Sequence, residues 1–159
     1  MQSIKTALCL TLAAVALTGC ALFSKKEVTT VRVHEEASTA LPAEHILTAE
    51  IPKTELKLAV APFATLTERD VLSAELYDTA GGKAILLRFD IHGTILLDEC
   101  TTRNRARYLV TFINNRPVAA WLVNQRILNG QFLVEGDFTD DEAKRVVDAL
   151  TEMSKKNRR

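Results

Sequence analysis

The sequence predicts an α+β fold, in which an antiparallel β-sheet has two α-helices packed on one face. Several short segments alternate apolar and polar residues, as strands with one buried face do. Glycine, proline and asparagine separate these segments, and two other segments repeat apolar residues at helical spacing. With 159 residues, of which 47% are hydrophobic and 25% charged, the chain has room for one modest domain with its own core.

A targeting segment precedes this domain. Lys5 is followed by 13 uncharged residues, 6–18, which end on small side chains as a secretory signal peptide does. This run is shorter than the roughly 20 residues that a membrane-spanning helix needs. The run closes with the residues Leu17, Thr18, Gly19 and Cys20.

These four residues resemble the lipobox of bacterial lipoproteins. The resemblance implies that the signal peptide is cut before Cys20 and that its thiol then carries a lipid with acyl chains such as palmitate. Several acyl chains together form a durable membrane anchor. The alternatives are an uncleaved anchor, or an ordinary signal peptide followed by an unrelated cysteine. Because Ala21 stands where an aspartate retains lipoproteins in the inner membrane, we expect an outer-membrane protein that faces the periplasm.

We therefore divide the chain into four parts. Residues 1–19 are the signal peptide, 20–26 the lipidated cysteine with a short tether, 27–154 the α+β domain and 155–159 a basic tail. The tail suits a solvated helix end, and contact with anionic lipid or a partner is the alternative. With Cys9 removed and Cys20 modified, only Cys100 keeps a free thiol, so we expect no intrachain disulfide.

The first third of the domain predicts short strands. Val31 and Val33 alternate with polar residues, and residues 45–51 and 55–61 are also typical of strands. Three prolines separate these segments. Because proline suits strand ends and edges, we expect an irregular region with several free edges that could accept an extended peptide.

Two hairpins and one helix follow. Residues 69–78 and 83–91 flank a tight turn at residues 80–82, and residues 107–113 and 118–123 flank the turn Asn-Asn-Arg-Pro. Between the hairpins, residues 93–104 have a helical spacing of apolar side chains. A last strand is predicted at residues 131–136.

The second helix has the clearest start signal. Thr139 can cap it while Glu142 bonds back to the cap, and Phe138 lies where a hydrophobic staple would pack on Ala143. Apolar residues then recur at helical spacing up to Met153. This stripe requires a sheet to cover it.

The stretch from residue 66 to residue 153 resembles the head subdomain in the first periplasmic region of SecD, a membrane component of bacterial preprotein export. The similarity rests on the joint spacing of residues that are generic when taken alone. The matching positions are Gly93, Thr101, Asn104, Arg107, Leu109, Ala120, Asn124, Ile127, Gly130, Gly136, Phe138, Thr139, Glu142 and Ala143. Two positions depart from the family pattern, Ala106 in place of glycine and Trp121 in place of a frequent proline.

The resemblance implies the same α+β fold and a binding role in the cell envelope. The proton coupling of SecD depends on its membrane helices. No transmembrane segment follows residue 153 in this sequence, so we expect that activity not to carry over. Lipoproteins with a free-standing SecD-like domain are the closer analogy.

The residues themselves indicate no enzyme chemistry. His34, His45 and His92 are scattered, and the sequence contains none of the common metal, nucleophile or phosphate-binding motifs. We therefore expect no cofactor and no metal. Lys+Arg and Asp+Glu both number 20, which argues against nucleic-acid partners. Cys100 is expected to be a small buried side chain rather than a redox group.

Trp121 is the candidate partner-binding residue. It is the single tryptophan and stands in a strand between small residues, so it either lies exposed as an anchor or packs under a second small cluster. Our hypothesis is a non-enzymatic, lipid-anchored protein that binds polypeptide or a partner protein, linked to protein export. The alternatives are a structural lipoprotein that docks on an envelope complex, and an enzyme with an unrecognised site.

Overall fold

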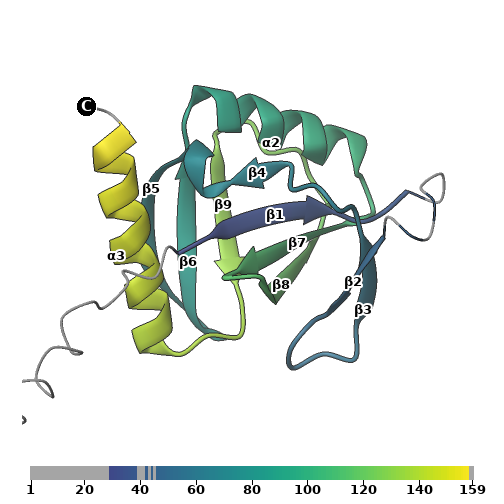
Figure 1. The fold of residues 1–159 in the computed structure, drawn as a ribbon, viewed down its shortest axis with the longest axis horizontal. Helices are drawn as coiled ribbons and strands as arrows, with labels where there is room; N and C mark the ends of the chain where they lie inside the picture. The colour runs from purple at the N-terminus through teal and green to yellow at the C-terminus, as the bar shows by residue number, and fades with distance from the viewer. Residues whose placement is uncertain (1–28, 39–41, 43, 45, 158–159) are drawn as a thin grey trace, which may run out of the picture.

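The computed structural model describes residues 29–38, 42, 44 and 46–157. The predicted signal peptide, Cys20 with its tether, His45 and the last two residues of the basic tail lie outside this part of the chain. Within it the α+β class is confirmed, with every strand pairing antiparallel and two α-helices (Figure 1). The strands are divided among three sheets.

The elements follow in chain order, and most predicted segments are confirmed with ends that differ by one or two residues. They are β1 (Val31–Glu35), β2 (Leu47–Glu50), β3 (Lys57–Val60), β4 (Leu66–Thr67), the 3₁₀ helix η2 (Glu68–Asp70), β5 (Val71–Thr79), β6 (Gly82–Phe89), α2 (Ile91–Arg103), β7 (Tyr108–Ile113), β8 (Arg116–Leu122), β9 (Gln131–Glu135) and α3 (Asp140–Asn157). Strand β4 and η2 have no counterpart in the sequence prediction.

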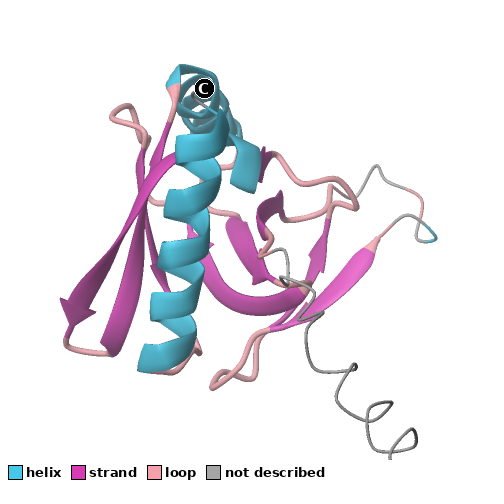
Figure 2. Cartoon of the chain, turned by 60° about the vertical axis from the view of Figure 1, so that its left-hand side comes forward, coloured by secondary structure: helices cyan, strands magenta, loops and turns pink. Residues whose placement is uncertain are grey.

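Two of the sheets enclose the main core. One has the strand order β4-β1-β7-β8 and the other β5-β6-β9. Both helices add side chains to this core, Leu97 and Cys100 from α2 and Val146 and Leu150 from α3. Helix α3 lies along the inner face of the three-stranded sheet, whose opposite face has no helix over it in the described chain (Figure 2).

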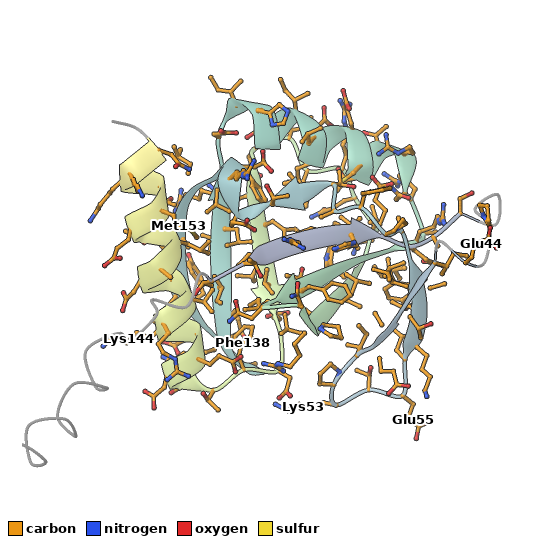
Figure 3. All side chains as sticks on the ribbon, in the orientation of Figure 1. Glu44, Lys53, Glu55, Phe138, Lys144 and Met153 are labelled. Atoms are coloured by element: carbon orange, nitrogen blue, oxygen red, sulfur yellow. The ribbon has the colours of Figure 1, made fainter. Side chains whose placement is uncertain are left out.

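A second, smaller core lies under the hairpin β2–β3. The hairpin covers the other face of the four-stranded sheet, where Leu58 and Val60 pack with Val110 of β7. Alternate residues of a strand point to opposite faces, so β7 serves both cores, with Leu109 and Ile113 in the main one. The tip of the hairpin is held by one ion pair, in which the Lys53 ammonium lies 2.7 Å from an Asp137 carboxylate oxygen (Figure 3).

The predicted turns and the start of α3 are confirmed. Asn114 and Asn115 have φ values of 51° and 63°, which suit asparagine in a tight hairpin. The Thr139 hydroxyl accepts a hydrogen bond from the backbone N–H of Glu142 at 3.2 Å. The Glu142 carboxylate instead accepts from Arg116 at 2.6 Å, which ties α3 to the β7–β8 hairpin.

Ala106 occupies a backbone conformation that favours glycine. It follows the end of α2 with a φ of 61°, and its N–H donates to the carbonyl of Val123 at 2.9 Å. A Cβ in this left-handed region costs about 1–2 kcal/mol. The alanine at this position therefore strains the turn.

We expect Ala106→Gly to raise the free energy of unfolding by about 1 kcal/mol, since the relief of strain exceeds the added entropy of the unfolded chain. Urea denaturation measures this change. Ala59→Gly, at an exposed position of β3 with no positive φ, is the matched control and should lower stability. Equal destabilisation by both variants would contradict this account.

Candidate functional site

Trp121 packs against the main core. Its ring meets the ring of Phe132 edge-on, with the centroids 5.8 Å apart, and Ala119 and Val123 belong to the same cluster. The pairing of β7 with β8 is irregular between Thr111 and Phe112, which places two consecutive residues of β8 in this core. The ring is half-buried, so a role of Trp121 in partner binding stays a prediction.

A broader candidate surface is the outer face of the three-stranded sheet. The strand register aligns Ser73, Arg88 and Gln131 in one row, Glu75, Leu86 and Leu133 in the next, and Tyr77, Ala84 and Glu135 in the third. We call these nine residues the outer face. None of them belongs to either core cluster, and Figure 2 shows this side of the sheet uncovered in the described chain.

The outer face combines an apolar centre with charged borders. Leu86 is buried among its neighbours, whereas Tyr77 and Leu133 are 51% and 37% exposed. A guanidinium nitrogen of Arg88 lies 3.3 Å from a Glu75 carboxylate oxygen. The buried Arg88 Nε has no hydrogen-bond partner among the described residues. Such a surface offers apolar contact beside a guanidinium that is held by an ion pair.

Both outer strands of this sheet keep an unpaired edge. Among the described residues β5 pairs only with β6, and so does β9. An extended polypeptide can add to such an edge through backbone hydrogen bonds. The sequence predicts free edges in the first third of the chain, where β2 also pairs on one side only among the described residues.

Most other polar groups inside the domain are used to hold it together. The Glu35 carboxylate accepts from Arg103 at 2.6 Å, from the Asn104 amide at 2.7 Å and from the Thr65 hydroxyl at 2.8 Å. Burial raises the pKa of this carboxyl, but the hydrogen bonds from Arg103, Asn104 and Thr65 outweigh it and leave the pKa below 4.5. The carboxylate therefore stays ionised in the folded protein near neutral pH.

The surroundings of the Cys100 thiol lower its expected reactivity. It is fully buried in the main core, and burial, together with the nearby charge of Glu35, raises its pKa to about 12. Since the thiolate is the reactive form, a nucleophilic or redox role has no support here.

The described histidines lie far apart. His34 is buried, with Nδ1 2.8 Å from the carbonyl oxygen of Ala61 and its ring against Phe112. Burial lowers the pKa of His34, against the opposing effect of the Ala61 hydrogen bond. This imidazole is a structural group beside the smaller core.

The His92 ring lies near the carboxylates of Asp70 and Asp90, a grouping that the sequence does not predict. One ligand atom each of Asp70, Asp90 and His92 lies within 4.8 Å of the others, as in a set that could hold a metal ion. Each acid already has a local role, because Asp70 accepts from Thr67 and Asp90 caps α2 by accepting from Gly93. The spacing of Thr67 and Asp70 is that of a capping box, and this is the sequence signal that could have placed Asp70 at the start of a helical turn.

The residues that carry the SecD resemblance are packing devices. A Cβ on Gly93 would lie 2.9 Å from the Cβ of Asp70, and one on Gly136 would lie 2.8 Å from the carbonyl oxygen of Val118. The Thr101 hydroxyl donates to Leu97 and accepts from the N–H of Ile127. Gly93 and Thr101 fix contacts of α2, and Gly136 lies against the backbone of β8.

Comparison with known proteins places the fold with that of SecDF. No family model matches the sequence, and no curated protein matches it. A solved structure of SecDF, a membrane component that enhances protein export, has a TM-score of 0.60 at 18% identity over 77% of this chain. SecDF in a super-membrane-facing form gives 0.59 at 19% identity, again over 77%. The matches span 62% and 18% of those chains. At this identity the likeness shows a shared fold.

The described chain provides no membrane-crossing helix. Neither α2 nor α3 combines the length and apolar character that spanning a bilayer requires.

We expect Glu35→Gln to lower the free energy of unfolding by about 2 kcal/mol at pH 7, since three donors lose a charged acceptor. The folded pKa lies below the unfolded one, so this contribution is complete above pH 4.5 and is lost as the pH falls through the folded pKa. Urea titrations between pH 7 and pH 3 should show the two proteins converging in acid. Glu50→Gln, which affects only an exposed pair with Lys57, should change stability by less than about 0.5 kcal/mol.

We also expect Cys100 to resist alkylation in the folded protein. Iodoacetamide at pH 8, followed by mass spectrometry of the peptides, should find Cys100 unmodified without urea and modified in urea. Rapid modification of the folded chain at this residue would show that the thiol is accessible and reactive.

Proposed function

We propose that this protein is a non-enzymatic, lipid-anchored protein of the bacterial cell envelope whose SecD-like domain binds polypeptide or a partner protein. In this proposal the outer face of the β5-β6-β9 sheet is the binding surface, and the activity is linked to protein export. The lipid on Cys20 holds the domain on the periplasmic side, at the outer membrane. No cofactor and no nucleic acid takes part.

The observation that carries the proposal is the uncovered outer face in a fold shared with SecDF. Tyr77 and Leu133 present apolar surface on either side of the buried Leu86, and the free edges of β5 and β9 border it. Polypeptide chains offer what such a surface binds, namely apolar side chains and backbone hydrogen-bonding groups. The low reactivity expected of Cys100 and the structural use of Glu35 support a binding role over an enzymatic one.

Docking on one folded envelope protein is the second candidate. Arg88 favours it, because its partly exposed guanidinium is held at the surface by the ion pair with Glu75. A preformed donor of this kind suits one complementary acceptor better than a succession of different unfolded chains. In that case the protein is a structural lipoprotein unrelated to export.

The test uses crosslinking in envelope membranes with the lipidated protein as bait. We expect Tyr77→Glu with Leu133→Glu to reduce the captured polypeptides at least about fivefold, because carboxylates would disrupt the apolar centre. Phe63→Glu, at a strongly exposed position outside the outer face, is the matched control and should leave capture unchanged.

Hydrogen exchange separates the two candidates. Added unfolded polypeptide should protect amides of β5 or β9 if chains are captured, whereas docking gives one stoichiometric crosslinked partner and no response to polypeptide. The proposed binding surface is wrong if the double variant captures as much as the Phe63→Glu control. Trp121→Ala tests the remaining candidate residue in the same assays.

A further inference from the structure

Helix α2 exposes apolar side chains that the core does not use. Ile91 is 83% and Ile95 53% exposed, and the helix buries Gly93, Leu97, Cys100 and Thr101 instead. Residues four apart lie on one face of a helix, so the two isoleucines are neighbours. Their exposure costs free energy in water and is not required by the packing of α2.

Leu128 extends this apolar surface. The segment before β9 runs alongside α2, where Arg126 pairs with Asp98 and Gly130 contacts Thr94. Thr94 and Asp98 lie three and seven residues after Ile91, in the same helical stripe. Leu128, which is 64% exposed, therefore borders the isoleucines. We call Ile91, Ile95 and Leu128 the α2 patch.

Basic side chains lie at the same end of the molecule. The last turns of α3 reach the start of β5, where the Ser154 hydroxyl donates to the carbonyl of Leu72, next to η2. Lys155 and Lys156 follow Ser154 and are exposed, as is Arg69 of η2. Figures 1 and 2 show the end of α3 close to the start of α2. The mixture of apolar and basic groups is typical of surfaces that bind lipid headgroups.

Acidic groups limit the positive charge of this end. Asp98 is bound by Arg126 and Asp70 by Thr67, whereas Glu99 and Glu152 are exposed. Apolar contact must therefore contribute more than charge.

The chain enters the domain within reach of this end. The N–H of Val31 donates to a Glu68 carboxylate oxygen at 3.3 Å, and the carbonyl of Asp70, two residues on, accepts from the N–H of Asp90 at the start of α2. Ten residues separate Cys20 from Val31, and the eleven steps between them, at 3.3–3.6 Å each, span at most about 40 Å. Acyl chains on Cys20 would thus keep the α2 patch within reach of the bilayer.

We infer that the α2 patch rests in the surface of the lipid bilayer, with Lys155, Lys156 and Arg69 beside anionic headgroups. The inference rests on the lipid anchor of the proposed function and adds an orientation to it. In Figure 2 the outer face of the three-stranded sheet points sideways from the end that holds α2. A domain oriented in this way keeps that face open to the periplasm.

The test measures depth with fluorescence quenching. The lipidated protein, made from the full chain, is reconstituted in vesicles of phosphatidylethanolamine and phosphatidylglycerol with or without brominated acyl chains. Ile95→Trp places an indole in the α2 patch. Tyr77→Trp is the matched control, because β5 runs from η2 at Val71 to the far turn after Thr79.

Brominated lipid should quench the Ile95→Trp protein at least about twofold more than the control, since an inserted side chain lies some 5–10 Å deep. Trp121 contributes the same background to both proteins. Equal quenching overturns the inference. The inference is also overturned if the indole of the Ile95→Trp protein is shielded from both brominated lipid and aqueous acrylamide, because a protein would then cover the patch.

The mass of the peptide that contains Cys20 shows whether this residue is acylated, and this distinguishes a failure of the lipid anchor from a failure of the proposed orientation. An acylated protein with equal quenching contradicts only the orientation. A protein without acyl chains contradicts the anchor, and adding that protein to the same vesicles still tests the α2 patch by the same comparison.

Discussion

The Glu35 carboxylate is the contact on which the arrangement of this domain depends. It stands at the end of β1 and binds Arg103 and Asn104 at the end of α2 and Thr65 before β4. Three segments that are distant in sequence therefore meet at one charge. Because the Asn104 amide also donates to the carbonyl of Cys100, the same contact closes the last turn of α2 over the main core. The four-stranded sheet and α2 are joined at this corner.

Local features were predictable from the sequence because their causes lie within a few residues. The cap at Thr139 and the two asparagines of the β7–β8 turn are of this kind. The sequence does not determine which side of the sheet Trp121 faces, because this depends on an irregularity in the pairing of β8 with β7. The meeting of Asp70, Asp90 and His92 was likewise hidden, since a hairpin separates η2 from α2 and only the folded chain brings them together.

The residues that mark the resemblance to SecD explain why the fold is recognisable while the activity is not. Gly93, Gly130 and Gly136 allow close approach of backbone and side chains. A side chain larger than hydrogen at these positions would come too close to its neighbours, so the glycines are required by the way the elements pack. The outer face carries no comparable constraint on residue size, so the shared fold does not determine its composition.

The hairpin β2–β3 is held less firmly than the rest of the domain. Its small core has five buried residues, and its tip depends on the exposed pair of Lys53 and Asp137. Backbone bonds from Ala37 and Ala61 fasten only its base. A unit with so few contacts opens at lower free energy than the main core. Opening of the hairpin would expose Val110 and Phe112 on the far side of the four-stranded sheet. The protein therefore contains an apolar surface that becomes accessible only on local unfolding.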